Sequence, residues 1–265
     1  MQPTFVFSDN IGSLRLVASM GTDASIVNAA RVSYTGQRPV SDDTALIRYL
    51  LRNEHMTPFE MVTFQFHVVA PLFVARQWMR HRTASINEQS ARYSILEERF
   101  YIPSEDNVCL QSTTNKQGRD ATIAQSSTLF VQKMRQLCAD AYRLYEEALE
   151  AGISREICRM ILPVNIYTQF YWQSNLRNIF HFIQLRADPH AQYEIQVYAK
   201  AMYNMVAAVC PIATKAFDDY CMGAISLSVP EQQLLQCPVF LTGVLASKRE
   251  QQELEKKIAK LNFRE

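Results

Sequence analysis

Guanidinium groups gather in one short stretch of this chain, residues 80–93, with the sequence RHRTASINEQSARY. Arg76 lies just before it, and Glu88 is the only acid inside it. Arginine side chains match phosphate oxygens through paired hydrogen bonds, so the pattern indicates a site for an anion. A solvated arginine face at the end of a helix would give the same pattern, and these residues alone leave both interpretations open.

The overall composition requires any cationic site to be local. The chain has 265 residues, 48% of them apolar, and a formal net charge of +1. A large buried core is therefore possible, whereas a non-specific nucleic-acid binder would carry a marked basic excess. No apolar stretch approaches the length of a membrane span, and the first residues do not resemble a signal peptide. We expect a soluble, cytoplasmic protein with no membrane partner.

The six cysteines and the histidines do not form a recognisable cluster. No cysteine pair has the spacing of a zinc or disulfide-exchange site, so we expect reduced thiols and no metal. Ser90 lacks the neighbours that activate a nucleophilic serine, which favours a binding role. His55 could exchange protons near neutral pH, but it also stands at a plausible helix end, where a structural histidine is equally ordinary.

The stretch at 80–93 matches RHRxxSxNExSxRY at every fixed position, and this is the signature of the flavin-dependent thymidylate synthases. The chain resembles that family over roughly residues 14–221. Five further segments carry the resemblance: AARVSY (29–34), HMTPFE (55–60), FHVVAPLFVARQW (66–78), REICRMILP (155–163) and NLRNIFHFIQLRADPHAQYEIQ (175–196).

The resemblance implies an enzyme that methylates deoxyuridylate (dUMP) to thymidylate (dTMP). FAD would carry the hydride, methylenetetrahydrofolate would donate the carbon, and NADPH would be the reductant. It also implies a homotetramer with FAD at subunit interfaces and with residues such as Arg159 reaching across. Two other functions remain conceivable: methylation of uracil in RNA, which the near-neutral charge disfavours, and a catalytically silent nucleotide-binding scaffold, which the intact signature disfavours.

By resemblance, the flavin site would be formed by one set of residues: Ser33, His55, Thr57, Glu60, Arg80, His81, Arg82, Asn87, Glu88, Asn175, Arg177 and His181. Some relatives have Asn where His181 stands.

The deoxyuridylate site would be formed by a second, overlapping set: Gln77, Arg80, Glu88, Ser90, Ala91, Arg92, Arg159 and Arg186. The residues acting on the reacting ring would be Ser90, Arg92, Glu88, Arg186 and His55. Many relatives have Gly at position 91, so a main-chain contact there requires backbone angles that suit a residue with a Cβ.

The elements that position these residues alternate between strand and helix. Strands are indicated at 13–19, 62–68 and 166–172. Helices are indicated at 25–32, from Ser41, and at 71–82, 121–150 (capped by Asp120), 154–163, 176–185 and 189–209 (capped by Asp188). A tight turn with capping-box spacing is indicated at 57–60, and polar loops at 83–91 and 103–120, the second of them mobile.

This order predicts an α+β fold, with a mixed or antiparallel sheet packed with long helices. No GxGxxG sequence is present, so the fold is not of the Rossmann type. We assign residues 1–222 to the catalytic domain and 223–265 to a C-terminal extension. The extension should contain an amphipathic helix that carries Leu254, Ile258 and Leu261 after a capping box at Ser247 and Glu250.

Overall fold

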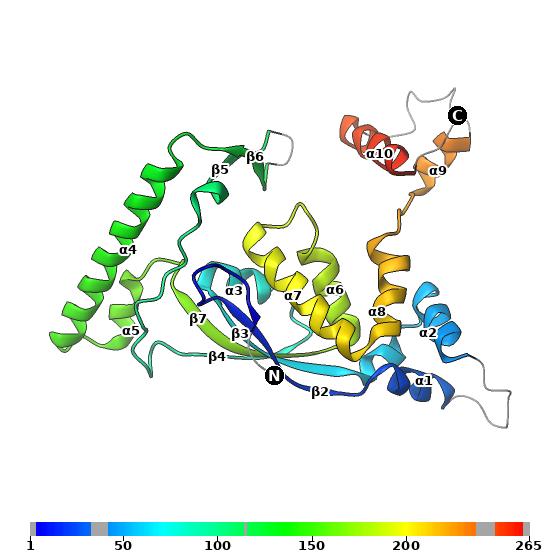
Figure 1. The fold of residues 1–265 in the computed structure, drawn as a ribbon, viewed down its shortest axis with the longest axis horizontal. Coiled ribbons are helices and arrows are strands. Elements are labelled where there is room, and N and C mark those ends of the chain that lie inside the picture. Colours follow the sequence, from blue (N-terminus) through cyan, green and yellow to red (C-terminus); the bar gives the residue numbers. More distant parts are fainter. Residues whose placement is uncertain (1–3, 33–41, 114–115, 237–246, 262–265) are drawn as a thin grey trace. The chain divides into compact units, whose positions relative to one another are not determined.

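The computed structural model describes residues 4–32, 42–113, 116–236 and 247–261, and Ser33 lies outside these ranges. The chain divides into two compact units, Met1–Phe217 and Asp218–Glu265 (Figure 1). No helix among the described residues is both long enough and apolar enough to span a bilayer. The assignment of 1–222 to a catalytic domain stays a prediction.

The first unit is built on a five-stranded antiparallel sheet, in the order β1 (Thr4–Phe5), β2 (Ser13–Met20), β3 (Thr63–Pro71), β7 (Tyr167–Asn175) and β4 (Ser85–Glu88). In β3, Phe64, Phe66 and Val68 are buried and alternate with more exposed residues. This alternation gives the sheet one apolar face. The antiparallel sheet and the helices confirm the predicted α+β class.

Three helices pack on the central strands of this sheet: α3 (Leu72–Trp78), α6 (Leu176–Arg186) and α7 (Tyr193–Val209) (Figure 1). The fully buried Trp78 ring lies 4.6 Å from the ring centroid of Phe182 on α6, and 5.5 Å from that of Phe170 on β7. Aromatic burial of this kind fixes the end of α3 to the core. The helix ends at Trp78 rather than at Arg82, and Arg80 and His81 follow in turns whose amides bond the carbonyls of Gln77 and Trp78.

A second group of helices lies near one end of the sheet: α1 (Asp23–Arg31), the turn η1 (Thr57–Met61), α2 (Asp43–Arg52) and α8 (Pro211–Phe217). The carboxylate of Asp23 accepts hydrogen bonds from the amides of Ile212 and Ala213 and so caps α8. The predicted start of α2 at Ser41 falls outside the described residues. The segment at 57–60 forms a short 3-10 turn as expected, but its N-cap is Met56 and no side chain caps it, so the predicted capping box at Thr57 and Glu60 was wrong.

The polar segment at 103–120 differs from the mobile loop that was predicted. It contains the turn η2 (Glu105–Asn107) and the strand β5 (Cys109–Gln111), which pairs with β6 (Arg119–Ile123). The long helix α4 (Ser127–Glu150) therefore begins later than residue 121, and Asp120 does not cap it. The Asp120 carboxylate instead accepts hydrogen bonds from the amides of Ala121 and Thr122.

Two other predicted boundaries were wrong for similar local reasons. The expected loop at 83–91 contains β4, whose mostly exposed side chains hide the strand period. Helix α7 begins at Tyr193 rather than at Pro189, because Asp188 bonds the amide of His190 in a turn instead of capping the helix. The remaining short elements, α5 (Arg155–Cys158) and η3 (Arg159–Ile161), confirm the helix expected after Ser154.

The described residues of the second unit form η4 (Asp218–Met222), α9 (Val229–Gln236) and α10 (Lys248–Leu261). The predicted capping box is present, with Ser247 Oγ accepting from the amide of Glu250 and Glu250 Oε2 accepting from the amide of Ser247. Lys257 on α10 donates to both carboxylate oxygens of Glu231 on α9, at 2.7 and 2.9 Å. This pairing lowers the pKa of Glu231 to about 2 and links the two helices.

Candidate functional site

A cationic cluster forms where α3 and α6 end, and we call it the Arg186 cluster: Gln77, Arg80, His81 and Arg186. Arg186 Nε donates to His81 Nε2 at 3.0 Å, and Arg186 Nη2 lies 3.5 Å from the carbonyl oxygen of Gln77. The His81 ring packs edge-on against Phe182, with 4.9 Å between centroids. The turn after α3 and the last turn of α6 are thereby held together.

His81 is neutral in this arrangement. Burial, and then the charge of Arg186, lower the pKa of His81 from 6.5 to about 4. Because its Nε2 accepts a hydrogen bond, the remaining ring proton belongs on Nδ1. Arg186 therefore has an uncharged partner that orients its guanidinium without neutralising it.

A second positive charge, that of Arg80, lies near Arg186. Partial burial lowers its pKa first, and the positive charge of Arg80 lowers it further. Two guanidinium groups that repel each other are stabilised by an anion between or beside them. The Arg186 cluster is thus suited to a phosphate or another anionic group.

Glu88 is the last residue of β4, and the signature loop that follows carries Ser90 and Ala91. Glu88 Oε1 accepts a hydrogen bond from Thr168 Oγ1 at 2.8 Å, which fixes that carboxylate against β7. The Ser90 carbonyl accepts from the amides of Tyr93 and Ser94, so the loop closes as a tight turn. Among the described residues other than glycine, positive φ occurs at Asn10 and Glu54, so Ala91 has backbone angles ordinary for a residue with a Cβ.

Arg92 lies beside a cavity of about 320 Å³, lined by Arg92, Tyr93, Ser154, Arg155 and Glu156. Its Nε stands 3.7 Å from Glu156 Oε2, and both side chains are more than half exposed. Arg155 Nη1 donates to the Tyr93 carbonyl at 2.8 Å and so joins α5 to the signature loop.

Arg159 follows Glu156 by three residues in the helical stretch α5–η3. Its side chain is exposed and does not line the cavity beside Arg92.

The expected flavin residues near η1 and the start of α6 also meet. Arg177 Nη1 donates to Glu60 Oε1 at 2.7 Å, in an ion pair between these two elements. Asn175 caps α6 by accepting from the amide of Asn178, and Thr57 opens η1. This group lies at the end of β3 and β7, where Thr63 pairs with Asn175.

The other expected flavin residues are more dispersed. His55 is exposed, with its ring edge-on to Tyr49 at 5.8 Å, and its amide bonds the Leu50 carbonyl at the end of α2. His181 lies 5.9 Å from His81, ring centroid to ring centroid. Arg82 and Asn87 are exposed on the turn after α3 and on β4. Nothing can be said of Ser33, which lies outside the described residues.

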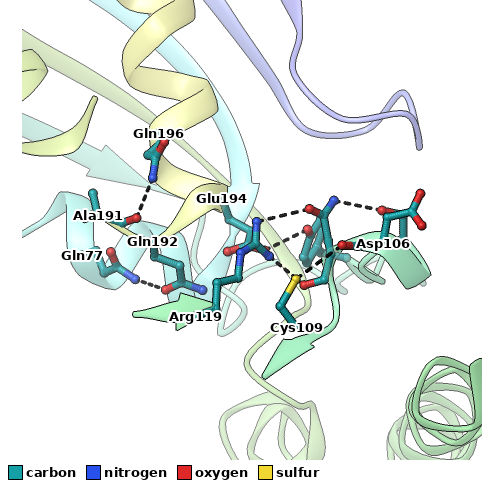
Figure 2. A network of polar contacts seen from close by, with 11 residues as sticks. Gln77, Asp106, Cys109, Arg119, Ala191, Gln192, Glu194 and Gln196 are labelled. Atoms are coloured by element: carbon teal, nitrogen blue, oxygen red, sulfur yellow. Dashed lines mark hydrogen bonds and ion pairs between the residues drawn. The ribbon is translucent and has the colours of Figure 1, made fainter. Parts of the chain in front are cut away.

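Two side chains that the sequence did not single out contact expected site residues. Gln192 Oε1, at the N-cap of α7, accepts a hydrogen bond from Gln77 Nε2 (Figure 2). Thr168 holds Glu88 from β7. Gln192 lies in a matched segment and Thr168 in a predicted strand. Nothing in the sequence indicates their contacts, because each contact joins residues that are distant in the chain.

An α+β fold with an arginine-rich site beside an antiparallel sheet is a class of structure suited to an anionic ligand. Comparison with known proteins narrows this class. The family model described as "Thymidylate synthase complementing protein" matches residues 15–212. A flavin-dependent thymidylate synthase from Ruegeria pomeroyi is 52% identical over 225 residues, which cover 82% of this chain and 74% of the relative.

A flavin-dependent thymidylate synthase from Thermus thermophilus is 48% identical, over 85% of this chain and 82% of that relative. The chain therefore belongs to the flavin-dependent thymidylate synthase family. Among solved structures, the UMP/dUMP methylase PolB from Streptomyces cacaoi, bound with 5-Br UMP, superposes with a TM-score of 0.73 at 35% identity, over 79% of this chain and 94% of that one.

Proposed function

We propose that this chain converts dUMP to dTMP, with FAD as hydride carrier, methylenetetrahydrofolate as carbon donor and NADPH as reductant. Family membership supports this reaction. The observation on this chain that carries it is the Arg186 cluster. Arg80 and Arg186 repel each other there, while the histidine between the two elements is neutral. Such a cluster is suited to an anionic ligand, and both a nucleotide and a dinucleotide cofactor are anionic.

The residues fit FAD in the chemistry of their donors. Arg80, His81, Arg82, Asn87, Glu88, Asn175, Arg177 and His181 would hold it, together with Ser33, His55, Thr57 and Glu60. The Glu60–Arg177 ion pair is more than a third exposed on the arginine side, so its donors remain accessible to a ligand. Bound FAD would supply the hydride that completes the methyl group, while the protein supplies orientation and charge.

For the nucleotide, Arg92 and Arg159 offer guanidinium donors and Ser90 offers a hydroxyl. Hydrogen-bond donors directed at a uracil carbonyl oxygen stabilise the negative charge that develops there when the ring carbon is attacked. The Glu88 carboxylate, fixed by Thr168, would accept from a ring N–H. Gln77, Arg80 and Arg186 would hold the other part of the nucleotide, and the Ala91 backbone would stay accessible.

We further propose a homotetramer in which neighbouring copies complete each site. Phe130, Leu137 and Leu144 stand seven residues apart along α4 and are 50%, 63% and 51% exposed. A seven-residue apolar repeat on one helix is typical of a helix that packs against a second helix. Oligomerisation through this face would bring the signature loop of one copy towards a second copy.

The decisive experiment uses purified protein loaded with FAD and reduced with NADPH. Methylenetetrahydrofolate and dUMP are then added, flavin reoxidation is followed by absorbance, and dTMP is measured by chromatography. A matched reaction with UMP is run because the similar PolB is described as a UMP/dUMP methylase. We expect dUMP-dependent formation of dTMP. Flavin binding without formation of any methylated nucleotide would indicate a catalytically silent scaffold and would overturn the proposal.

A further inference from the structure

The β5–β6 hairpin contacts the start of α7 beside the expected nucleotide residues. Arg119, the first residue of β6, reaches from the hairpin to Glu194 in the first turn of α7 (Figure 2). It also lies over the ring of Tyr193 in the same turn. Gln192 precedes that turn and bonds Gln77. A side chain outside the signature is thus joined to the Arg186 cluster by a short series of contacts.

The contacts of Arg119 fix it on both sides. Towards its own hairpin, Nη1 donates to the Asn107 carbonyl at 2.7 Å and Nη2 donates to Asn107 Oδ1 at 3.2 Å. Towards α7, its Cζ lies 4.8 Å above the Tyr193 ring centroid, and Nη1 lies 4.0 Å from Glu194 Oε1. Planar guanidinium groups favour this combination of paired hydrogen bonds and stacking on an aromatic ring.

Glu194 needs this partner because it is buried. Only 6% of the residue is exposed, and its Oε1 accepts a hydrogen bond from Tyr101 Oη at 3.1 Å. Burial and the neighbouring Glu194 raise the pKa of Tyr101, so the phenol keeps its proton and donates. A buried carboxylate with one neutral donor gains stability from a nearby guanidinium. Arg119 thereby holds the first turn of α7 at a defined position.

That turn determines where Gln192 lies. The Gln192 carbonyl accepts from the amides of Ile195 and Gln196, and Gln196 Nε2 folds back to the Ala191 carbonyl at 2.7 Å. With the backbone fixed, Gln192 Oε1 meets Gln77 Nε2. Because one N–H of Gln77 is committed to this bond, its Oε1 is left to accept from a ligand.

We propose that Arg119 and Gln192 are positioning residues of the nucleotide site: Arg119 fixes the first turn of α7, and Gln192 on that turn orients the amide of Gln77 towards the nucleotide. The inference rests on the proposed role of Gln77 in binding dUMP. It assigns a function to the hairpin, which lies outside the segments that carry the family resemblance.

Double-mutant cycles on the FAD-loaded enzyme test the proposed order of contacts, with dUMP as the probe and its dissociation constant as the readout. Gln192→Ala should weaken dUMP binding by about three- to tenfold, the effect of one lost hydrogen bond. In a Gln77→Ala background, Gln192→Ala should add less than about a twofold change. Arg119→Ala should weaken binding similarly, and should add little when Gln192 is already alanine.

Several outcomes separate this inference from a purely structural role. Arg119→Lys keeps the charge beside Glu194 but loses the paired bonds, so it should recover stability more fully than dUMP affinity. Arg143→Ala serves as the control, because Arg143 pairs with Asp140 on α4 away from these contacts. Equal losses in the single- and double-mutant backgrounds, or an unchanged dUMP affinity in folded Arg119→Ala, would overturn the inference. Failure of the unaltered enzyme to bind dUMP would instead refute the proposed function.

Discussion

Replacing Arg92 with alanine separates nucleotide binding from flavin binding and from folding. Within the chain, Arg92 contributes little to stability, since its guanidinium is 55% exposed and its partner Glu156 is 57% exposed at 3.7 Å. Exposed ion pairs of this kind contribute about 0–1 kcal/mol. Loss of a guanidinium from a desolvated nucleotide phosphate or ring costs far more, on the order of 2–5 kcal/mol. We therefore expect dUMP affinity to fall by about 30- to 5,000-fold.

The assay has three readouts on one preparation: FAD content from the absorbance ratio, the midpoint of thermal unfolding, and dUMP affinity by calorimetry. Arg99→Ala is the matched control, because Arg99 is 53% exposed and also pairs with a glutamate, Glu97. Flavin content and unfolding should be nearly unchanged in both variants, with dUMP affinity lost only in Arg92→Ala. Equal loss of both ligands would indicate a folding defect, and unchanged dUMP affinity would remove Arg92 from the nucleotide site.

Three further predictions concern assembly, thiols and pH. A mixture of Arg92→Ala and Arg186→Ala variants tests whether different copies supply these two residues to one site. Two inactive variants should regain about a quarter of full activity in equal hybrids if different copies supply these residues, and no recovery in verified hybrids would contradict sharing. Single cysteine replacements should leave methylation largely intact, apart from packing losses at buried positions such as Cys210, whose pKa is raised to about 12 by burial. A well-folded, FAD-loaded cysteine variant without turnover would show that a thiol takes part. Since the pKa of His81 is lowered from 6.5 to about 4, unfolding takes up a proton at that residue as the pH falls below about 6.5. Because His81 is partly exposed, we discount its pKa shift and expect the free energy of unfolding to fall by about 1 kcal/mol between about pH 7 and pH 5 in denaturant titrations. The His81→Asn variant should lose correspondingly less. An identical pH dependence in the two proteins would refute the neutral histidine.

The sequence predicted the centre of the fold better than its edges. Alternation located β3 and β7 because one side of each strand is buried, with Phe66 and Trp172 pointing into the core. The strand β6 could not be predicted in this way, since all of its residues are exposed and no face repeats. Asp120 was misplaced as a helix cap because a carboxylate that bonds nearby amides looks the same before a helix and within a hairpin.

The sequence predicted which residues belong to the candidate site, but not how they contact one another. The signature identified the arginines, since the family match is local in sequence. It could not indicate that Gln192 contacts Gln77, because the pair is separated by 115 residues and meets only through the packing of α3 against α7. Nor could it show that His81 is neutral, since that depends on the burial of its ring and on Arg186.

The position of Trp78 at the end of α3 couples the core to the site. Its ring is fully buried among Phe170, Trp172 and Phe182, and Arg80 follows two residues later. Trp78 contributes only packing, yet its position determines where the guanidinium of Arg80 lies. Catalysis is sensitive to shifts of a fraction of an ångström in such a group. In this chain, substitution of Trp78 should therefore reduce turnover as well as stability. A survey of variants that scored activity alone would count Trp78 among the functional residues, although its side chain is fully buried.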